Sequence, residues 1–354
     1  MPEFKKQFGF LGHDLAPGRK PLIVAEVGFN HNGDVELAEA MISAARDNGA
    51  DAVKLQTFIG RELYAETFRA QDPDNPGVEI PFYEFWERYQ LTRDDYRRLF
   101  AFAERLNIPL FSTPFDEGSL AMLLDLGMQA VKIASGDLTH TSLLKAAGAA
   151  GVPVVLSSGM ATEAEAGRAL EVLHGAGARQ VALLHCVSHY PARPDEMNLN
   201  VIPRLRERFG VPVGLSDHTL DSASSVVATA LGAVMIEKHF TTDRNLPGAD
   251  QRVSLDPQGL RELRQAVDQT RQTLGTGDKE PQESELPTLK GARRSVVARE
   301  TIAAGTPLER DMLAFKRPCN GVPAEDVAAL LGRSARVDIP AETAITWEMV
   351  ESRS

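Results

Sequence analysis

The sequence predicts a (β/α)8 barrel, the TIM-barrel fold, followed by a small β-rich domain. Eight short apolar runs recur over the first 240 residues of the 354-residue chain, and segments with helical periodicity lie between them. Nearly every apolar run ends in a polar or ionisable side chain. Parallel strands covered by helices are apolar throughout, and a barrel carries its chemistry where the strands end. These observations together predict a barrel enzyme.

Each apolar run supplies one strand of the predicted barrel, in chain order. The first run, PLIVAE, ends at Glu26, and the last, AVMIEKH, carries Glu237 and ends at His239. We expect the eight strands at residues 21–26, 51–56, 108–113, 129–135, 152–158, 181–186, 211–218 and 233–239.

The segment after the first strand shows the helical pattern most clearly. Leu37 and Met41 recur on one face of residues 35–50. Asp34 is the expected N-cap of this helix, and Gly49 is the expected C-cap. Similar patterns predict helices at residues 84–107, 119–127, 140–151, 162–177, 194–210, 222–232 and 256–275.

One connection is too long for an ordinary loop between a strand and a helix. Residues 59–83 are rich in Pro, Asp and Asn, and we expect them to reach over the mouth of the barrel. Residues 277–292 are polar, contain Pro and lack periodicity, which is typical of an interdomain linker. The predicted organisation is therefore a barrel domain at 1–276, this linker, and a second domain at 293–354.

Composition and charge argue against several other classes of protein. The chain is 43% hydrophobic and can bury a large core, while its formal net charge of −11 argues against a nucleic-acid-binding surface. No run approaches the ~18 apolar residues of a membrane span, and the N-terminus lacks the apolar core of a signal peptide. We expect a cytoplasmic protein without a nucleic-acid or membrane partner. Cys186 and Cys319 are expected to be reduced thiols.

Two lysines lie at the ends of predicted strands. Lys54 and Lys132, with several hydroxyls, favour an anionic ligand such as a phosphate or a phosphorylated carboxylate. Either lysine could instead form a buried ion pair with Glu26 or Glu237. A Schiff-base lysine is a further alternative, because a neighbouring cation lowers the pKa of a buried lysine. The hydroxyls belong to Thr113, Ser135, Ser157 and Ser216.

Two histidines, His218 and His239, end the last two strands, which are neighbours in a closed barrel. Their imidazoles suit a catalytic Mn²⁺, Mg²⁺ or Zn²⁺ that polarises a carbonyl oxygen, although each could equally be a hydrogen-bonding or acid/base group. Asp217 and Glu237 flank them and are candidates to orient the rings. His31 either belongs to a turn or enters the site.

The strand-end segments also match a known family. In chain order they include AEVGFNHNG, FSTPFD, VKIASGDL, SSGMAT, LHCVSHYPA, GLSDHT, EKHFT and PGADQRVSLDP, and the tail carries KRPCNG. They closely resemble the signature segments of the sialic acid synthases, the N-acetylneuraminate synthase family. The tail from residue 293 is similar to the C-terminal antifreeze-like (SAF) domain of that family. The resemblance spans nearly the whole chain.

The resemblance implies condensation of phosphoenolpyruvate with an N-acyl hexosamine, typically N-acetylmannosamine, to give a nine-carbon 2-keto sugar acid and phosphate. His218 and His239 match the ligands of a divalent metal, Mn²⁺ or Mg²⁺, that polarises the sugar aldehyde. Glu26 matches a carboxylate that acts in general acid/base catalysis, and Glu237 would stabilise the cation that develops during the condensation. Positions that match phosphoenolpyruvate-binding residues are Lys54, Thr113, Lys132, Ser135, Ser157 and Ser216.

Further residues are implied to bind the sugar. Gln56, Tyr190 and Asp250 match positions that contact its hydroxyls. Arg317 matches an arginine that reaches the N-acyl group in the neighbouring protomer's site, which implies a domain-swapped homodimer. Ser188 stands where the family often has Asn, so one contact near phosphoenolpyruvate differs.

The resemblance does not identify the acceptor sugar. Enzymes that make legionaminate or pseudaminate from 6-deoxy or diacetamido sugars share almost all of these motifs, as does a branch in spore-coat polysaccharide synthesis. Residues 59–83 contact the sugar in the family, and Asp72, Asn75 or neither would bind a hydroxyl. Two other classes remain: an aldolase that works through a lysine imine, and a non-catalytic binding protein suggested by the antifreeze-like tail.

Overall fold

The structure, a computed structural model, describes residues 2–73, 75 and 77–352. The chain divides into two compact units, Met1–Gly275 and Thr276–Ser354. Each unit has a hydrophobic core of its own. The first unit contains the predicted barrel, and the second contains the predicted β-rich domain.

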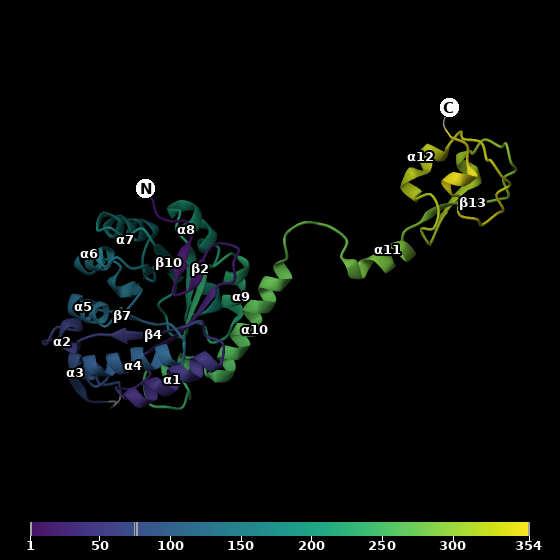
Figure 1. Cartoon of the computed structure of the whole chain (residues 1–354). Helices are drawn as coiled ribbons and strands as arrows, with labels where there is room; N and C mark the ends of the chain where they lie inside the picture. Colours follow the sequence, from purple (N-terminus) through teal and green to yellow (C-terminus); the bar gives the residue numbers. More distant parts are fainter. Residues whose placement is uncertain (1, 74, 76, 353–354) are drawn as a thin grey trace. The chain divides into compact units, whose positions relative to one another are not determined.

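Eight parallel strands form a closed barrel in the first unit (Figure 1). Each strand pairs with the next along the chain, and β12 pairs with β3 to close the ring. The predicted (β/α)8 fold and its eight strands are therefore confirmed. The strands are β3 Leu22–Gly28, β4 Ala52–Thr57, β7 Leu110–Pro114, β8 Val131–Ile133, β9 Val154–Ser157, β10 Val181–Cys186, β11 Val213–Asp217 and β12 Met235–His239.

Helices cover the outside of the barrel, as the alternating pattern predicts (Figure 1). The Asp34 side chain accepts hydrogen bonds from two backbone N–H groups of the first turn of α1, so the expected N-cap is confirmed. The helices that follow the barrel strands are α1 Val35–Asp47, α4 Arg93–Arg105, α5 Glu117–Asp125, α6 Thr141–Ala149, α7 Glu163–Gly175, α8 Val201–Phe209, α9 Ala223–Ala230 and α10 Pro257–Leu274.

The single helix predicted over residues 84–107 is two helices. α3 (Phe82–Glu87) ends before α4 begins at Arg93. Thr92 starts α4 through a capping box, in which its hydroxyl accepts from the Asp95 backbone N–H and the Asp95 carboxylate accepts from the Thr92 N–H. This local capping outweighs the continuous helical periodicity.

An N-terminal hairpin that the sequence did not predict packs on the barrel core. It consists of β1 (Phe8–Phe10) and β2 (His13–Leu15). The fully buried ring of Phe10 meets the ring of Phe111 edge-on at 5.5 Å. Phe111 shares its side of β7 with Thr113, two residues nearer the mouth. The hairpin therefore covers the N-terminal end of the barrel.

The long connection after β4 has structure of its own. It contains α2 (Gly60–Leu63), β5 (Arg69–Gln71) and β6 (Glu79–Pro81), and the two strands pair antiparallel. Its aromatic side chains form a hydrophobic cluster separate from the barrel core. Tyr64, Pro73 and Phe82 line the cavity at the mouth, so the expected position of this segment is confirmed.

Asp72 and Asn75 lie away from that cavity. The Asp72 carboxylate is 2% exposed and accepts two hydrogen bonds of 2.9 Å from the Arg88 guanidinium. It also accepts from the Asn75 amide nitrogen at 2.9 Å. Of the three alternatives, the structure therefore favours neither residue as a contact for a sugar hydroxyl.

The second unit is a small domain with short strands. β13 (Ser295–Ala298) pairs antiparallel with β14 (Leu313–Lys316), and α12 spans Val327–Leu330. The expected linker is not irregular throughout, because α11 occupies Leu286–Ala292. Among the described residues, no helix is both long and apolar enough to cross a membrane.

Candidate active site

The strand ends of the barrel surround a cavity of about 570 Å³. All residues of the barrel that the resemblance assigns to catalysis, metal binding or substrate binding line it, whereas Arg317 belongs to the second unit. The lining residues that the sequence analysis named are Glu26, Lys54, Gln56, Thr113, Lys132, Ser135, Ser157, Ser188, Tyr190, Ser216, His218, Glu237, His239 and Asp250.

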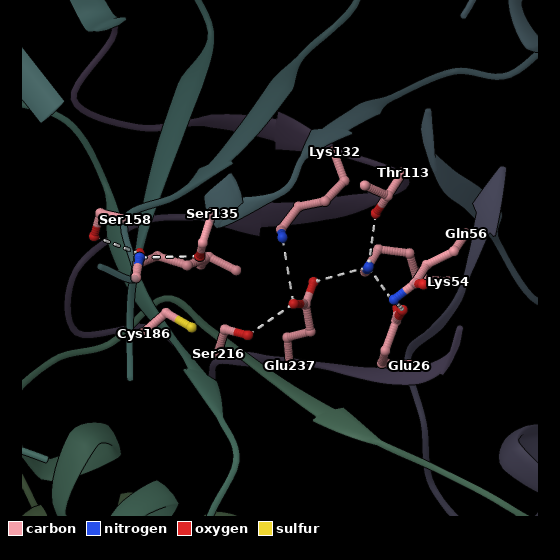
Figure 2. A network of polar contacts seen from close by, with 12 residues as sticks. Glu26, Lys54, Gln56, Thr113, Lys132, Ser135, Ser158, Cys186, Ser216 and Glu237 are labelled. Carbon is pink, nitrogen blue, oxygen red and sulfur yellow. Dashed lines mark hydrogen bonds and ion pairs between the residues drawn. The ribbon is translucent and has the colours of Figure 1, made fainter. Parts of the chain in front are cut away.

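An ion-pair network occupies the floor of this cavity, and Glu237 lies between the two lysines (Figure 2). Lys54 Nζ lies 2.5 Å from Glu26 Oε2 and 3.7 Å from Glu237 Oε2, and it donates to Thr113 Oγ1 at 2.8 Å. Lys132 Nζ lies 3.4 Å from Glu237 Oε1. Both lysines therefore form the ion pairs that the sequence left possible.

Strand geometry explains why these groups meet. Glu26 is the register partner of Lys54 on β4 and of His239 on β12. Alternate residues of a strand point to the same side, so Gln56 joins Lys54 in the interior. The Gln56 amide donates to Glu26 Oε1 at 3.1 Å. Ser216, the register partner of Glu237, donates to Glu237 Oε1 at 2.9 Å.

The two carboxylates have different pKa values because the lysines offset burial unequally. Burial raises the pKa of Glu26 to about 7, although the Lys54 ammonium opposes the rise. Burial would also raise the pKa of Glu237, but Lys132 and Lys54 together lower it to about 2. Two carboxyl groups with separated pKa values in one site suit different roles, with one exchanging a proton and the other staying ionised.

Burial opposes the charge of both lysines, with different outcomes. At Lys54 the carboxylates of Glu237 and Glu26 outweigh burial and raise its pKa. At Lys132 burial prevails and lowers the pKa, because among the described residues only Glu237 lies within ion-pair distance and Lys54 repels it. Lys132 is therefore the more weakly held cation of the pair.

Hydroxyl groups gather on the opposite side of the cavity from Glu26 and Gln56. Ser135 Oγ accepts from the Gly159 backbone N–H at 2.9 Å, and the buried Ser157 Oγ has no hydrogen-bond partner among the described residues. A Cβ on Gly159 would lie 2.2 Å from Ser188 Oγ and 2.8 Å from Ser135 Oγ. Glycine at this position therefore lets these hydroxyls and a backbone N–H converge, as an anion site requires.

The two histidines lie side by side, with ring centroids 5.5 Å apart. His218 Nδ1 lies 2.8 Å from the Val187 carbonyl oxygen and donates to it, which leaves Nε2 as the free ligand atom. His239 Nδ1 lies 3.4 Å from Asp250 Oδ2. Burial lowers the pKa of His239 well below its usual value, which keeps the ring neutral.

A histidine pair of this kind fits a divalent metal. A metal-bound imidazole usually donates its other N–H to a carbonyl or carboxylate oxygen, as His218 does to Val187. Within residues 2–73, 75 and 77–352, no group of three or more His, Cys, Asp or Glu side chains is arranged to hold a metal ion. The protein therefore offers two imidazoles, and substrate and water would complete the coordination.

The expectation that Asp217 orients a histidine ring is wrong. The Asp217 carboxylate accepts from the hydroxyls of Thr219 and Ser225 and lies 3.1 Å from Lys238 Nζ. Lys238 alternates with Glu237 along β12, so it points out of the barrel interior, and Asp217 faces the same helical layer. Val187 supplies the oxygen that orients the ring instead.

His31 belongs to a turn and does not line the cavity. Asn32 and Gly33 both have positive φ values, of 52° and 74°, and His31 Nδ1 accepts from the Gly33 backbone N–H at 3.1 Å. His185, inside β10, bonds through Nε2 to the Met197 carbonyl oxygen at 2.6 Å. Both side chains have structural contacts outside the site.

Several residues of the cavity were not foreseen. The Cys186 thiol lies 3.8 Å from His218 Nδ1, and this contact outweighs burial and lowers the pKa of Cys186. A group of aromatic side chains lines the side opposite the hydroxyls. In the sequence these aromatic residues only stand next to strand ends or within the long connection and the helical pattern after it, so nothing marks them as cavity residues. They are Phe29, Tyr64, Phe82, Phe85, Trp86 and Phe115.

Comparison with known proteins places this site in a family. The NeuB family model matches residues 41–279, and the SAF domain model matches residues 293–351. The chain belongs to the NeuB family. The resemblance to the sialic acid synthases, including the antifreeze-like tail, is thereby confirmed.

Relatives of this NeuB-family chain carry different names. It is 34% identical to the N,N'-diacetyllegionaminic acid synthase of Legionella pneumophila over 93% of this chain and 94% of that protein. It is 32% identical to the N-acetylneuraminate-9-phosphate synthase of Mus musculus over 96% and 97%. The crystal structure of N-acetylneuraminic acid (sialic acid) synthetase from Leptospira borgpetersenii is 32% identical, with a TM-score of 0.73 over 81% of this chain and 96% of that one.

Proposed function

We propose that this NeuB-family chain condenses phosphoenolpyruvate with an N-acyl hexosamine and water to give a nine-carbon 2-keto sugar acid and phosphate. A bond forms between C3 of phosphoenolpyruvate and the aldehyde carbon of the open-chain sugar. Water adds at C2, and the bond between C2 and the phosphate oxygen breaks, so phosphate leaves. The network of two lysines and two carboxylates beside two imidazoles carries this proposal.

The anion is proposed to bind between Lys132 and the serine hydroxyls. Ser135, Ser157 and Ser216 offer donors around it, and Thr113 positions Lys54. Lys132 is held at 3.4 Å by one carboxylate, so an incoming phosphate or carboxylate competes for it more readily than for Lys54. Preformed cations in a buried site stabilise phosphate as it leaves.

Glu26 is proposed to move the proton. Its pKa near 7 suits a group that gives a proton to the aldehyde oxygen or takes one from water. Glu237 stays ionised and stabilises the positive charge that develops at C2. Both carboxylates contact Lys54, which fixes their positions relative to each other.

His218 and His239 would hold the divalent metal. When bound there, Mn²⁺ or Mg²⁺ would polarise the sugar aldehyde. Gln56, Tyr190 and Asp250 line the cavity near these residues and are proposed to bind the sugar hydroxyls. Arg317 is proposed to reach the N-acyl group in the site of a second copy, in a domain-swapped homodimer of the cytoplasm.

Phosphate release from phosphoenolpyruvate tests the proposal. The assay compares N-acetylmannosamine, a diacetamido 6-deoxy analogue and no sugar, each with Mn²⁺ and with excess EDTA. Sugar-dependent, metal-dependent release supports the proposal, and ¹⁸O in the bridging position of phosphoenolpyruvate should appear in phosphate. Label left in the sugar acid, or trapping of a lysine imine by borohydride, would favour another mechanism. No release with any acceptor would overturn the proposal.

A further inference from the structure

The cavity has a second wall with different chemistry from its charged floor. Six aromatic side chains form it, and we refer to them together as the aromatic wall. Four of them come from the long segment between β4 and β7, and the other two directly follow barrel strands β3 and β7. The aromatic wall consists of Phe29, Tyr64, Phe82, Phe85, Trp86 and Phe115.

The rings of the aromatic wall support one another around Trp86. Its indole meets Phe29 edge-on at 5.2 Å and stacks on Tyr64 at 6.0 Å between centroids. Tyr64 also meets Phe82 edge-on at 4.8 Å. Edge-to-face contacts of this kind hold rings in defined orientations. The aromatic wall is therefore a preformed surface.

The aromatic wall lies across the barrel from the anion site. Around the closed ring of strands, β4 stands opposite β10. The aromatic wall follows β3, β4 and β7, whereas Ser135, Ser157 and Ser188 follow β8, β9 and β10. Lys132 and Glu237 lie between Ser135 and the side chains of Glu26 and Gln56 (Figure 2). The neutral sugar, not the phosphorylated substrate, would therefore meet the aromatic wall.

The aromatic wall offers few hydrogen bonds. Only Tyr64 and Trp86 carry a polar side-chain atom, and Trp86 Nε1 is buried within the aromatic wall. A hydroxylated chain placed here would give up hydrogen bonds to water without replacing most of them. A methyl group would lose nothing.

We propose that the aromatic wall is the specificity-determining subsite for the end of the acceptor sugar remote from the aldehyde. It selects a sugar whose far end carries a methyl group over one whose far end carries a hydroxyl. The methyl group packs on the rings. This inference rests on the proposed function and assigns its acceptor to the 6-deoxy class.

Competing acceptors test the inference with the full-length protein. We would measure kcat/KM for N-acetylmannosamine and for its 6-deoxy analogue, 2-acetamido-2,6-dideoxymannose, at saturating phosphoenolpyruvate and Mn²⁺. A small number of apolar contacts discriminates by about 10- to 100-fold, and we expect a preference of that size for the second sugar. Trp86→Leu should lower the ratio of the two values by about tenfold, and Trp86→Phe should lower it less.

Phe68→Leu is the matched control. Phe68 stacks on Tyr64 in the same aromatic group, but it is 49% exposed and does not line the cavity. Its substitution should leave the ratio unchanged. If Trp86→Leu fails to fold, as judged by circular dichroism, Tyr64→Leu replaces it with the same expected direction.

Two results would overturn the inference: a wild-type preference for N-acetylmannosamine, or an unchanged ratio in the folded Trp86 or Tyr64 variant. Calorimetric measurement of the binding of the two sugars without phosphoenolpyruvate distinguishes failure of this inference from failure of the proposed function. Absence of turnover with both sugars contradicts the condensation reaction. The difference between their binding constants, and its loss in Trp86→Leu, still tests the aromatic wall.

Discussion

Lys54 and Lys132 show how the same side chain acquires different properties in one cavity. Lys54 has three partners within 3.7 Å, whereas Lys132 has Glu237 at 3.4 Å. Both ammonium groups are about equally buried, so the difference arises from their partners. The more fully paired lysine contributes to the fold, and the less paired one remains available to a ligand.

Lys54→Met should therefore destabilise the barrel more than Lys132→Met. Removing one partner of a buried ion pair costs about 3 kcal/mol, because Glu26 and Glu237 would face each other without the cation. Lys132→Met leaves Glu237 with Lys54 and should mainly raise the KM for phosphoenolpyruvate. Urea denaturation of both variants measures the difference, and equal or reversed losses of stability would contradict this account.

His31 makes stability depend on pH outside the site. It is 1% exposed, and burial lowers its pKa from 6.5 to about 4. Between these values the unfolded chain binds the proton and the folded chain does not, so stability falls as pH falls from 6.5 to 4. The loss amounts to about 3 kcal/mol.

His31→Asn keeps an acceptor for the Gly33 N–H but removes this titration. Denaturant unfolding at pH 7 and at pH 4.5 should show a smaller loss of stability in the variant than in the wild type. His189→Asn, at a side chain that is 62% exposed, is the control and should keep the wild-type slope. Parallel slopes for all three proteins would show that His31 is protonated in the fold.

At the scale of elements, the segment between β4 and β7 depends on a local anchor. The buried Asp72 carboxylate and the Arg88 guanidinium join its strand pair to the end of α3, which carries Trp86. The backbone near Gly33 fits closely against this region, since a Cβ on Gly33 would lie 2.5 Å from the Arg88 carbonyl oxygen. The anchor therefore sets where the aromatic rings stand.

Asp72→Asn should loosen this anchor while keeping the size of the side chain. We expect the KM for the acceptor sugar to rise about fivefold, equivalent to about 1 kcal/mol of added ordering cost on binding. The KM for phosphoenolpyruvate should change little, because its proposed site lies across the barrel. Steady-state kinetics with each substrate varied in turn decides this, and equal changes in both KM values would argue against a local role.

Sequence patterns predict the strands and helices of the barrel but not the contacts between its side chains. The eight strands are predictable because buried parallel strands are apolar along their whole length. The break before Thr92 was missed because a capping box can interrupt a continuous periodic segment. The pairing of Lys132 with Glu237 joins β8 to β12, which are not neighbours in the ring, and no spacing in the sequence encodes it.

The candidate site likewise contains residues that the sequence predicts and residues that it does not. Residues at strand ends, such as Lys54 and His239, were found because the fold brings all strand ends together. Phe85 and Trp86 fell within a predicted helix and were not recognised, since a ring that lines a cavity and a ring that packs in a core have the same periodicity. Val187 was missed because a backbone carbonyl has no sequence signature.

At the scale of the molecule, the two units have separate cores joined by an exposed stretch. Residues 276–288 are exposed, and α11 begins within them at Leu286. Contacts within each core hold each unit together. The barrel should therefore keep its structure when the connection is cut.

Limited trypsin digestion should cleave first at the exposed Lys279. The barrel fragment should unfold as cooperatively as before, as followed by circular dichroism. If Arg317 reaches the site of a second copy, cleavage should raise the KM for the sugar and spare binding of phosphoenolpyruvate. Loss of cooperative unfolding on cleavage would show that the barrel depends on the second unit.

The hairpin β1–β2 closes the end of the barrel remote from the site, with the rings of Phe10 and Phe111 fully buried there. Both substrates must then enter through the mouth, and the lysines of the anion site, which belong to β4 and β8, lie deeper than the rings that follow the strand ends. A sugar already in place would obstruct phosphoenolpyruvate behind it. The order of arrival follows from this geometry: phosphoenolpyruvate first, sugar second, with excess sugar acting as a competitive inhibitor of phosphoenolpyruvate.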